Sequence, residues 1–202
     1  MVEKDTYKTI VNITESILYK DKNSKFFTYA FPVLNENDIK NYLDSLKKKH
    51  HAASHYCYAY QIGTEIITYR ANDDGEPNNS AGLPIYRQIQ AFEVTNILVV
   101  VVRYFGGIKL GVGGLVNAYK TAAFLILNNS KIITKTIYVT FVLCFDYDRM
   151  NMVMQIIKEK RLEIVNQRLE IACQITISVR KKEATTIYKL FESIYKVTIK
   201  KL

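Results

Sequence analysis

Cysteine is scarce in this chain of 202 residues, and the cysteines that occur stand far apart. Cys57, Cys144 and Cys173 lie singly within apolar or strand-like runs, and no CxxC pair is present. Small disulfide-stabilised domains and zinc ribbons need paired cysteines at characteristic spacings. The sequence therefore argues against both classes, and we expect three buried thiols.

Long hydrophobic runs are also missing. No stretch approaches the roughly 18 apolar residues that indicate a membrane-spanning helix. The first ten residues, MVEKDTYKTI, have neither the hydrophobic segment of a signal peptide nor the arginine-rich composition of a transit peptide. We therefore expect a cytoplasmic protein that makes no use of a membrane.

Histidine is limited to His50, His51 and His55. Two of them lie near Cys57, but neither an HExxH motif nor a cysteine pair accompanies them. We therefore predict no metal site and no cofactor. We also assign no catalytic residue, because the members of a Ser-His-Asp or Cys-His site meet only in space.

Charge is unevenly balanced between the two signs. Lysine and arginine number 28 against 19 acidic residues, which gives a net charge of +9. Up to position 135 there are 16 basic and 12 acidic residues, and 12 and 7 follow. Basicity in both halves favours a polyanionic partner such as RNA, although the same balance also serves solubility alone.

The most informative stretch runs from Ile97 to Tyr119 and reads ILVVVVRYFGGIKLGVGGLVNAY. Its first six residues are apolar and mostly β-branched, which predicts a strand buried on both faces. Five glycines follow within nine positions, and a helical pattern then begins at Leu115 and ends at Asn129. A glycine loop before a helix presents free N–H groups to an anion. The predicted anion or nucleic-acid site comprises Arg103, Tyr104, Gly106, Gly107, Lys109, Gly111, Gly113 and Gly114.

Two familiar nucleotide motifs do not fit this loop. A Walker A loop requires Gly-Lys-Ser/Thr at the start of the helix, where this chain has Gly113, Gly114 and Leu115. A dinucleotide fingerprint requires a third small residue where Val116 stands, and an acid near position 135, which is Lys135.

A second loop is acidic and carries Asp73, Asp74, Gly75, Glu76, Pro77 and Ser80. Ser80 is placed to cap a helix that extends to about Ala91. The three carboxylates allow two interpretations. They could bind Mg²⁺ or act as acid and base, or they could form ion pairs with Arg103 and Lys109 or cap turns. We favour the structural role, as ion pairs or turn caps, over metal binding and catalysis.

Tyr56, Tyr58 and Tyr60 alternate along a predicted strand and so share one face. Such a row could stack on RNA bases. A half-buried aromatic face that packs under a helix is the preferred interpretation, because large aromatic side chains are ordinary core material.

The remaining pattern predicts two domains, residues 1–134 and 135–202. Residues 11–33 form a hairpin, a helix capped by Asn35 or Asn37 extends to Lys49, and Ile66 to Arg70 is a strand. Residues 131–135 are a basic link. The rest follows the βαββαβ order of a ferredoxin-like domain, with elements at Ile137–Phe145, Arg149–Lys160, Glu163–Arg168, Ile171–Val179, Glu183–Tyr195 and Val197–Ile199.

The acidic loop, with Ser80-Ala81-Gly82-x-Pro84, and the run RYFGGIKLGxGGLV from Arg103 resemble the motifs of the IMPACT/YigZ family. Ser24-Lys25-Phe26 and His55-x-Cys57-Tyr58-Ala59 resemble its further marks. The chain departs from the family at Asn117, commonly a basic residue, and at Tyr56, commonly Asn.

The resemblance implies a two-domain α+β protein. Its N-terminal α/β-sandwich domain would be similar to the ribosomal-protein domain 2-like superfold, and its C-terminal domain to domain five of elongation factor G. Eukaryotic relatives restrain the kinase that phosphorylates initiation factor 2, with help from a separate N-terminal domain.

Three functional hypotheses remain open. The first is a non-enzymatic RNA- or ribosome-associated module linked to the regulation of translation. The second is a regulator of translation that binds a protein partner, and the third is a metal-assisted enzyme that uses Asp73, Asp74 and Glu76. The sequence leaves the oligomeric state undetermined.

Overall fold

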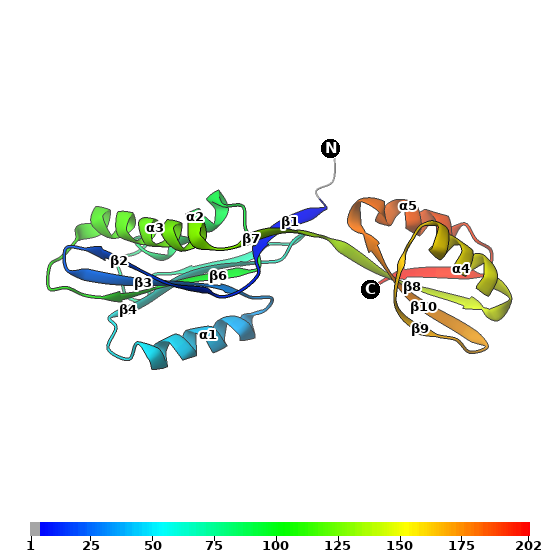
Figure 1. The fold of residues 1–202 in the computed structure, drawn as a ribbon, viewed down its shortest axis with the longest axis horizontal. Coiled ribbons are helices and arrows are strands. Elements are labelled where there is room, and N and C mark those ends of the chain that lie inside the picture. Colours follow the sequence, from blue (N-terminus) through cyan, green and yellow to red (C-terminus); the bar gives the residue numbers. More distant parts are fainter. Residues whose placement is uncertain (1–4) are drawn as a thin grey trace. The chain divides into compact units, whose positions relative to one another are not determined.

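A computed structural model describes residues 5–202, which form two compact units (Figure 1). Residues 7–135 make the first unit. Residues 136–202 make the second, together with Asp5 and Thr6. Asp5 is held there by Arg180, whose Nε lies 2.5 Å from its Oδ2 atom, and by the N–H group of Ile137. The fold is α+β in both units.

The first unit is built on a five-stranded antiparallel sheet. In spatial order its strands are β2 (Thr14–Asp21), β3 (Ser24–Pro32), β6 (Ile97–Tyr104), β4 (His55–Ile62) and β5 (Thr68–Asn72). The central strand β6 contains the six apolar residues of the sequence, and all six are fully buried. The prediction of a strand buried on both faces is therefore confirmed.

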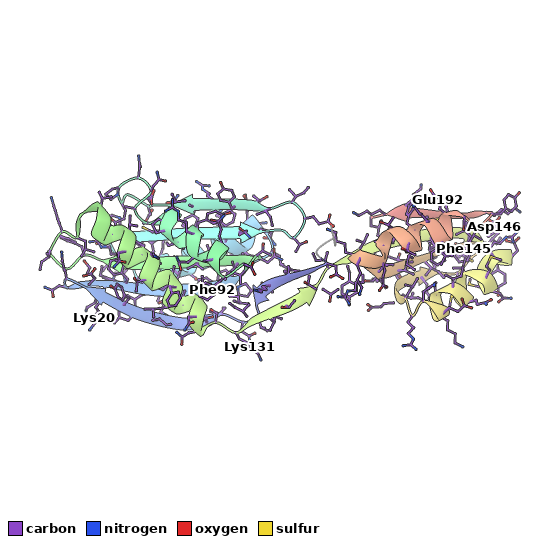
Figure 2. All side chains as sticks on the ribbon, turned by 90° about the horizontal axis from the view of Figure 1, so that it is seen from above. Lys20, Phe92, Lys131, Phe145, Asp146 and Glu192 are labelled. Atoms are coloured by element: carbon purple, nitrogen blue, oxygen red, sulfur yellow. The ribbon has the colours of Figure 1, made fainter. Side chains whose placement is uncertain are left out.

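Helices cover both faces of this sheet, which makes the unit an α/β sandwich (Figure 1). One face packs against α1 (Glu36–Lys49), and the other packs against α2 (Gly82–Ala91) and α3 (Gly111–Asn129). Side chains alternate along β6, so that Val100 faces the α1 side while Val99 and Val101 face α2 and α3. On this second side lies Phe92, which follows α2 (Figure 2). The centre of its ring is 5.8 Å from the centre of the Phe124 ring.

The α1 side confirms two predictions. Asn35 caps α1, because its side-chain oxygen accepts a hydrogen bond from the N–H group of Asp38 at 3.0 Å. Tyr56, Tyr58 and Tyr60 belong to the cluster on this side, where Tyr60 is buried and the other two are partly buried. The tyrosine row is thus packing material under a helix, as we preferred.

Residues 131–135 precede the division between the two units, as expected of a link, but most of them form a strand that was not predicted. Strand β7 (Ile132–Thr136) pairs with β1 (Thr6–Ile10) in a separate two-stranded sheet. Its sequence, two adjacent isoleucines followed by three polar residues, lacks the alternation that predicts a strand.

The second unit has the predicted βαββαβ order. Its sheet has the strand order β11-β8-β10-β9, all antiparallel, and α4 and α5 pack their apolar sides against it. At the end of β8, Phe145 is buried in this core and Asp146 is exposed (Figure 2). The ferredoxin-like prediction is confirmed, with elements at β8 (Tyr138–Asp146), α4 (Met150–Glu159), β9 (Glu163–Arg168), β10 (Ala172–Arg180), α5 (Lys181–Glu192) and β11 (Val197–Lys201).

Among residues 5–202, no helix is both long and apolar enough to cross a membrane.

Candidate functional site

Asp73 organises the acidic loop from within. Its Oδ1 atom accepts hydrogen bonds from the N–H groups of Ala81 at 2.9 Å and Gly82 at 2.8 Å, and its Oδ2 atom accepts one from Asn79. Asp73 therefore caps the start of α2 from nine positions upstream. The prediction that Ser80 caps this helix is wrong, because the buried Ser80 hydroxyl donates to the carbonyl of Pro77 at 2.6 Å.

Asp74 attaches the same loop to strand β4. Its Oδ2 atom accepts a hydrogen bond from the N–H group of Tyr56 at 2.6 Å, and its carbonyl oxygen lies 2.8 Å from Nδ1 of His55. Neither Asp73 nor Asp74 pairs with Arg103 or Lys109. For these two acids the ion-pair alternative is wrong and the capping alternative holds, because their side-chain oxygens accept hydrogen bonds from backbone N–H groups in and beside the loop.

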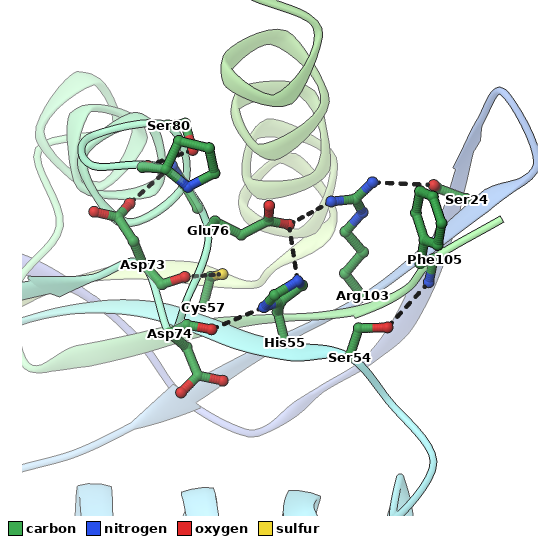
Figure 3. A network of polar contacts seen from close by, with 12 residues as sticks. Ser24, Ser54, His55, Cys57, Asp73, Asp74, Glu76, Ser80, Arg103 and Phe105 are labelled. Carbon is green, nitrogen blue, oxygen red and sulfur yellow. Dashed lines mark hydrogen bonds and ion pairs between the residues drawn. The ribbon is translucent and has the colours of Figure 1, made fainter. Parts of the chain in front are cut away.

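Glu76 does form the expected ion pair. Its Oε1 atom lies 2.6 Å from Nη1 of Arg103, and the two side chains are only 4% and 6% exposed (Figure 3). Nη2 of Arg103 donates to the hydroxyl of Ser24 at 3.3 Å. Removing one member of such a pair leaves a buried charge without compensation.

Two buried groups extend this network under α3. The hydroxyl of Tyr119 donates to the same Oε1 atom of Glu76 at 2.7 Å, and the thiol of Cys57 lies 3.3 Å from that hydroxyl. Burial raises the pKa of the Cys57 thiol and of the Tyr119 hydroxyl far above their ordinary values. Both groups are therefore protonated at neutral pH, and Cys57 is unsuited to act as a nucleophile.

His55 lies beside the ion pair with a defined tautomer. Nδ1 faces the carbonyl oxygen of Asp74, which can only accept a hydrogen bond, so Nδ1 carries the proton. In the neutral ring, Nε2 then presents its lone pair 3.9 Å from Oε1 of Glu76.

The predicted anion site is divided by the sheet. Arg103 and Tyr104 are neighbours on β6 and therefore point to opposite faces. The Tyr104 hydroxyl lies 3.0 Å from Nδ1 of His50, and its ring packs with Phe27 on the α1 side. Tyr104 is thus separated from Arg103 and from the glycines.

The glycines of this loop differ in whether the fold requires glycine at their positions. Helix α3 begins at Gly111, four residues before the predicted start, so Gly111, Gly113 and Gly114 lie in its first turn. A side chain at Gly106 would meet the backbone of Asn23 at 2.1 Å, and one at Gly114 would press on Leu110. Gly107 and Gly111 have positive φ. Gly113 has neither strain nor a close neighbour, so the fold alone does not require glycine there.

A cavity of about 350 Å³ opens between the acidic loop and the start of α3. Phe105 also lines this cavity, although it is not among the predicted site residues, and its N–H group donates to the hydroxyl of Ser54 at 3.3 Å. The only signal was an aromatic residue directly before the glycines. The cavity is lined by His55, Glu76, Pro77, Arg103, Phe105, Lys109, Leu110, Gly111, Val112 and Leu115.

The rim of this cavity is cationic and apolar. Lys109 is exposed, and among the described side chains it makes no ion pair. Leu110 precedes α3 without a side-chain cap, so the first N–H groups of the helix have no side-chain acceptor at that position. Phe105, Ile108 and Val112 are each about half exposed, at 49%, 48% and 57%.

The three carboxylates of the acidic loop do not converge. Figure 3 shows those of Asp73, Asp74 and Glu76 pointing in different directions. Within residues 5–202, no group of three or more acidic, histidine or cysteine side chains is placed to hold a metal ion.

Comparisons with known proteins agree with this architecture. The Impact N-terminal domain matches residues 22–127. An IMPACT family member from Haemophilus influenzae is 32% identical over 163 residues, which cover 80% of this chain and 79% of the relative.

Two further matches are partial or remote in sequence. YvyE, an IMPACT family member from Bacillus subtilis, is 39% identical over 114 residues, or 56% of this chain, and the chain spans only 52% of the length of that relative. A crystal structure of a hypothetical protein has a similar fold, with a TM-score of 0.71, 24% identity and 97% of both chains covered. On the strength of the domain match and the Haemophilus relative, this chain belongs to the IMPACT family.

Proposed function

We propose that the first unit is a non-enzymatic module that binds RNA, free or within the ribosome, and thereby takes part in the regulation of translation. The binding surface is the start of α3 with Lys109 and the preceding glycine loop. Membership of the IMPACT family supports the link to translation, since the sequence resemblance already indicated relatives that act on the initiation machinery.

The main support for this proposal is that the fold does not require glycine at position 113. Glycine in the first turns of a helix is less favourable than alanine by up to about 1 kcal/mol. At Gly113 neither positive φ nor crowding offsets that cost. A partner that approaches the backbone closely does require the absence of a side chain at this position.

The electrostatics of the surface select an anionic partner. The N-terminus of a helix carries a partial positive charge and free N–H groups, and both favour phosphate. Lys109 adds an exposed cation two residues before the helix. The net charge of +9 attracts a polyanion over longer distances.

The test compares Gly113→Ala with Asn117→Ala, which alters an exposed residue one turn further along α3. Both changes should raise the melting temperature, because alanine is the better helix former at either position. Only Gly113→Ala should weaken binding of a single-stranded RNA, measured by fluorescence anisotropy at low salt. Equal affinity of both variants and the parent protein would contradict the proposal.

Salt provides a second readout. The logarithm of the binding constant should fall with the logarithm of salt concentration, by about 0.7 for each neutralised phosphate on a single strand. Lys109→Ala should lower the magnitude of that slope by about 0.7, the equivalent of one phosphate contact. The fold should stay intact, because Lys109 is exposed.

A protein partner is the second candidate, and the exposed side chains of Phe105, Ile108 and Val112 favour it. Large apolar residues are enriched in the centre of protein interfaces. Binding to such a partner would depend little on salt, and Ile108→Ser would weaken it more than Lys109→Ala. An enzymatic role finds less support, because the carboxylates of the acidic loop are engaged separately.

A further inference from the structure

The floor of the cavity beside α3 offers hydrogen-bond acceptors. Oε1 of Glu76 already receives hydrogen bonds from Arg103 and Tyr119, while Oε2 receives none from the described residues. When the His55 ring is neutral, its Nε2 atom, 3.9 Å from Oε1, presents a second acceptor. A bound group that reaches this floor therefore needs N–H or O–H donors.

Charge decides which donor fits. Arg103 neutralises Glu76 inside the protein, and its Nε atom is buried without a hydrogen-bond partner. A ligand ammonium would lie close to this guanidinium in surroundings of low polarity, and like charges repel strongly there. A neutral amino group offers two N–H donors without that repulsion.

The walls are suited to a planar ring. Leu110 and Leu115 are buried beside the cavity, and Phe105 is about half exposed. The guanidinium of Arg103 lies over the Phe105 ring, 5.5 Å from its centre. Aromatic side chains on such a surface stack with nucleic-acid bases.

The opening of the cavity is cationic, and its volume matches a small ligand. Lys109 and the first turn of α3 stand at the opening, where they favour phosphate. The volume of about 350 Å³ is at the lower end of the range of small-molecule sites, about 300–1,000 Å³. The cavity thus has room for one unit with a neutral amino group, a planar ring and an anion.

We propose that this cavity binds a single nucleotide whose base carries an exocyclic amino group, with that group on Glu76 and His55, the ring beside Phe105 and the phosphate at the start of α3. Adenine, cytosine and guanine meet the requirement. Uracil presents carbonyl oxygens on either side of its one N–H group, and these would face the acceptors of the floor. The proposal rests on the RNA-binding function above, and it adds base preference.

The experiment measures the affinity of the full-length protein for 5′-phosphorylated octamers of A, C and U at one salt concentration. We expect octamers of A and C to bind about tenfold more tightly than the octamer of U, because uracil would leave a buried acceptor of the cavity without a donor. His55→Ala should reduce this preference while the melting curve stays cooperative. The matched control is His51→Ala, an exposed histidine outside the cavity, which should retain it.

Competition identifies the source of the nucleotide. Displacement of the A octamer by AMP, and not by adenosine or UMP, would support a site that also takes free nucleotides. Retention of the base preference without displacement would support a nucleotide held within a strand. Displacement by an N-acetylated dipeptide ending in glutamine, and not by AMP, would overturn the nucleotide assignment.

The failures can be told apart. Equal affinity for all three octamers would overturn the cavity proposal and leave RNA binding in place. Failure to bind any octamer at low salt would overturn the proposed function itself.

Discussion

The two units of this chain differ in what they bury. Apart from tyrosine and cysteine, the buried polar or charged residues among residues 5–202 all lie in the first unit, and the core cluster of the second unit is apolar. Burying polar groups costs stability unless each finds a partner. The core of the second unit therefore depends on apolar packing, whereas the first unit also buries the ion pair of Glu76 and Arg103 beside the cavity.

The ion pair of Glu76 and Arg103 should give the largest effect in this comparison. Arg103→Met leaves the Glu76 carboxylate buried without its partner and should lower the free energy of unfolding by about 3–5 kcal/mol. Arg168→Met breaks an ion pair of 2.8 Å in the second unit, but both side chains are more than half exposed, so it should cost less than about 1 kcal/mol. Urea unfolding measures both.

A double variant sharpens this result. Glu76→Gln combined with Arg103→Met removes both charges, and it should recover a large part of the loss, because no uncompensated charge remains. If the double variant were as unstable as Arg103→Met alone, packing around the arginine stem would be the dominant contribution instead.

The acidic loop should give the next largest effect. Asp73→Ala removes the acceptor for three N–H groups at the start of α2 and should cost about 2 kcal/mol, the upper end of helix-capping effects. Asp74→Asn keeps an amide oxygen for the N–H group of Tyr56 and should cost less than about 1 kcal/mol. A larger loss for Asp74→Asn than for Asp73→Ala in thermal melting would reverse the roles assigned to the two acids.

The contrast between the units also explains how much the sequence could predict. The apolar rhythm of residues 137–199 located every element of the second unit to within a few residues, because only packing dictates that rhythm. In the first unit the same reasoning located β6 and α1. It placed the start of α3 at Leu115, because glycines weaken the helical pattern even where the backbone is helical.

The candidate site shows a second limit. The pairing of Glu76 with Arg103 was predicted by matching charges, but Asp73 and Asp74 form hydrogen bonds with backbone groups, which sequence patterns do not show. Phe105 and His55 join the cavity only through the pairing of β4 with β6, which places His55 opposite Arg103. Local sequence patterns do not reveal which residues of two distant strands lie opposite each other.

Separating the units should have a smaller effect than the core changes. We predict that a fragment of residues 1–134 unfolds cooperatively, because the sheet core of the first unit lies wholly within residues 7–135. Its melting temperature should be lower than that of a fragment ending at residue 137, which retains all of β7 (Ile132–Thr136). A non-cooperative melt of both fragments, with a cooperative full-length chain, would show that the first unit depends on the second.

The smallest expected effect concerns pH and the α1 side of the first unit. His50 is buried between Tyr29 and Tyr104, whose hydroxyls lie 2.6 and 3.0 Å from its ring nitrogens. Burial lowers the pKa of His50 below its ordinary value of 6.5, and the charge of Lys49 acts in the same direction. The unfolded chain therefore binds a proton at a pH where the folded protein does not. The stability from His50 is fully present above pH 6.5 and declines as the pH falls from there toward the pKa of the folded state.

Measuring this contribution requires a variant that cannot titrate. His50→Gln should unfold with a weaker dependence on pH between about 7.5 and 5.5 than the parent protein, because the titrating ring is gone. His51→Gln, at an exposed position next to it, should keep the dependence of the parent. Chemical denaturation at several pH values provides the comparison. An unchanged slope in His50→Gln would show that the acid sensitivity of the first unit does not come from His50.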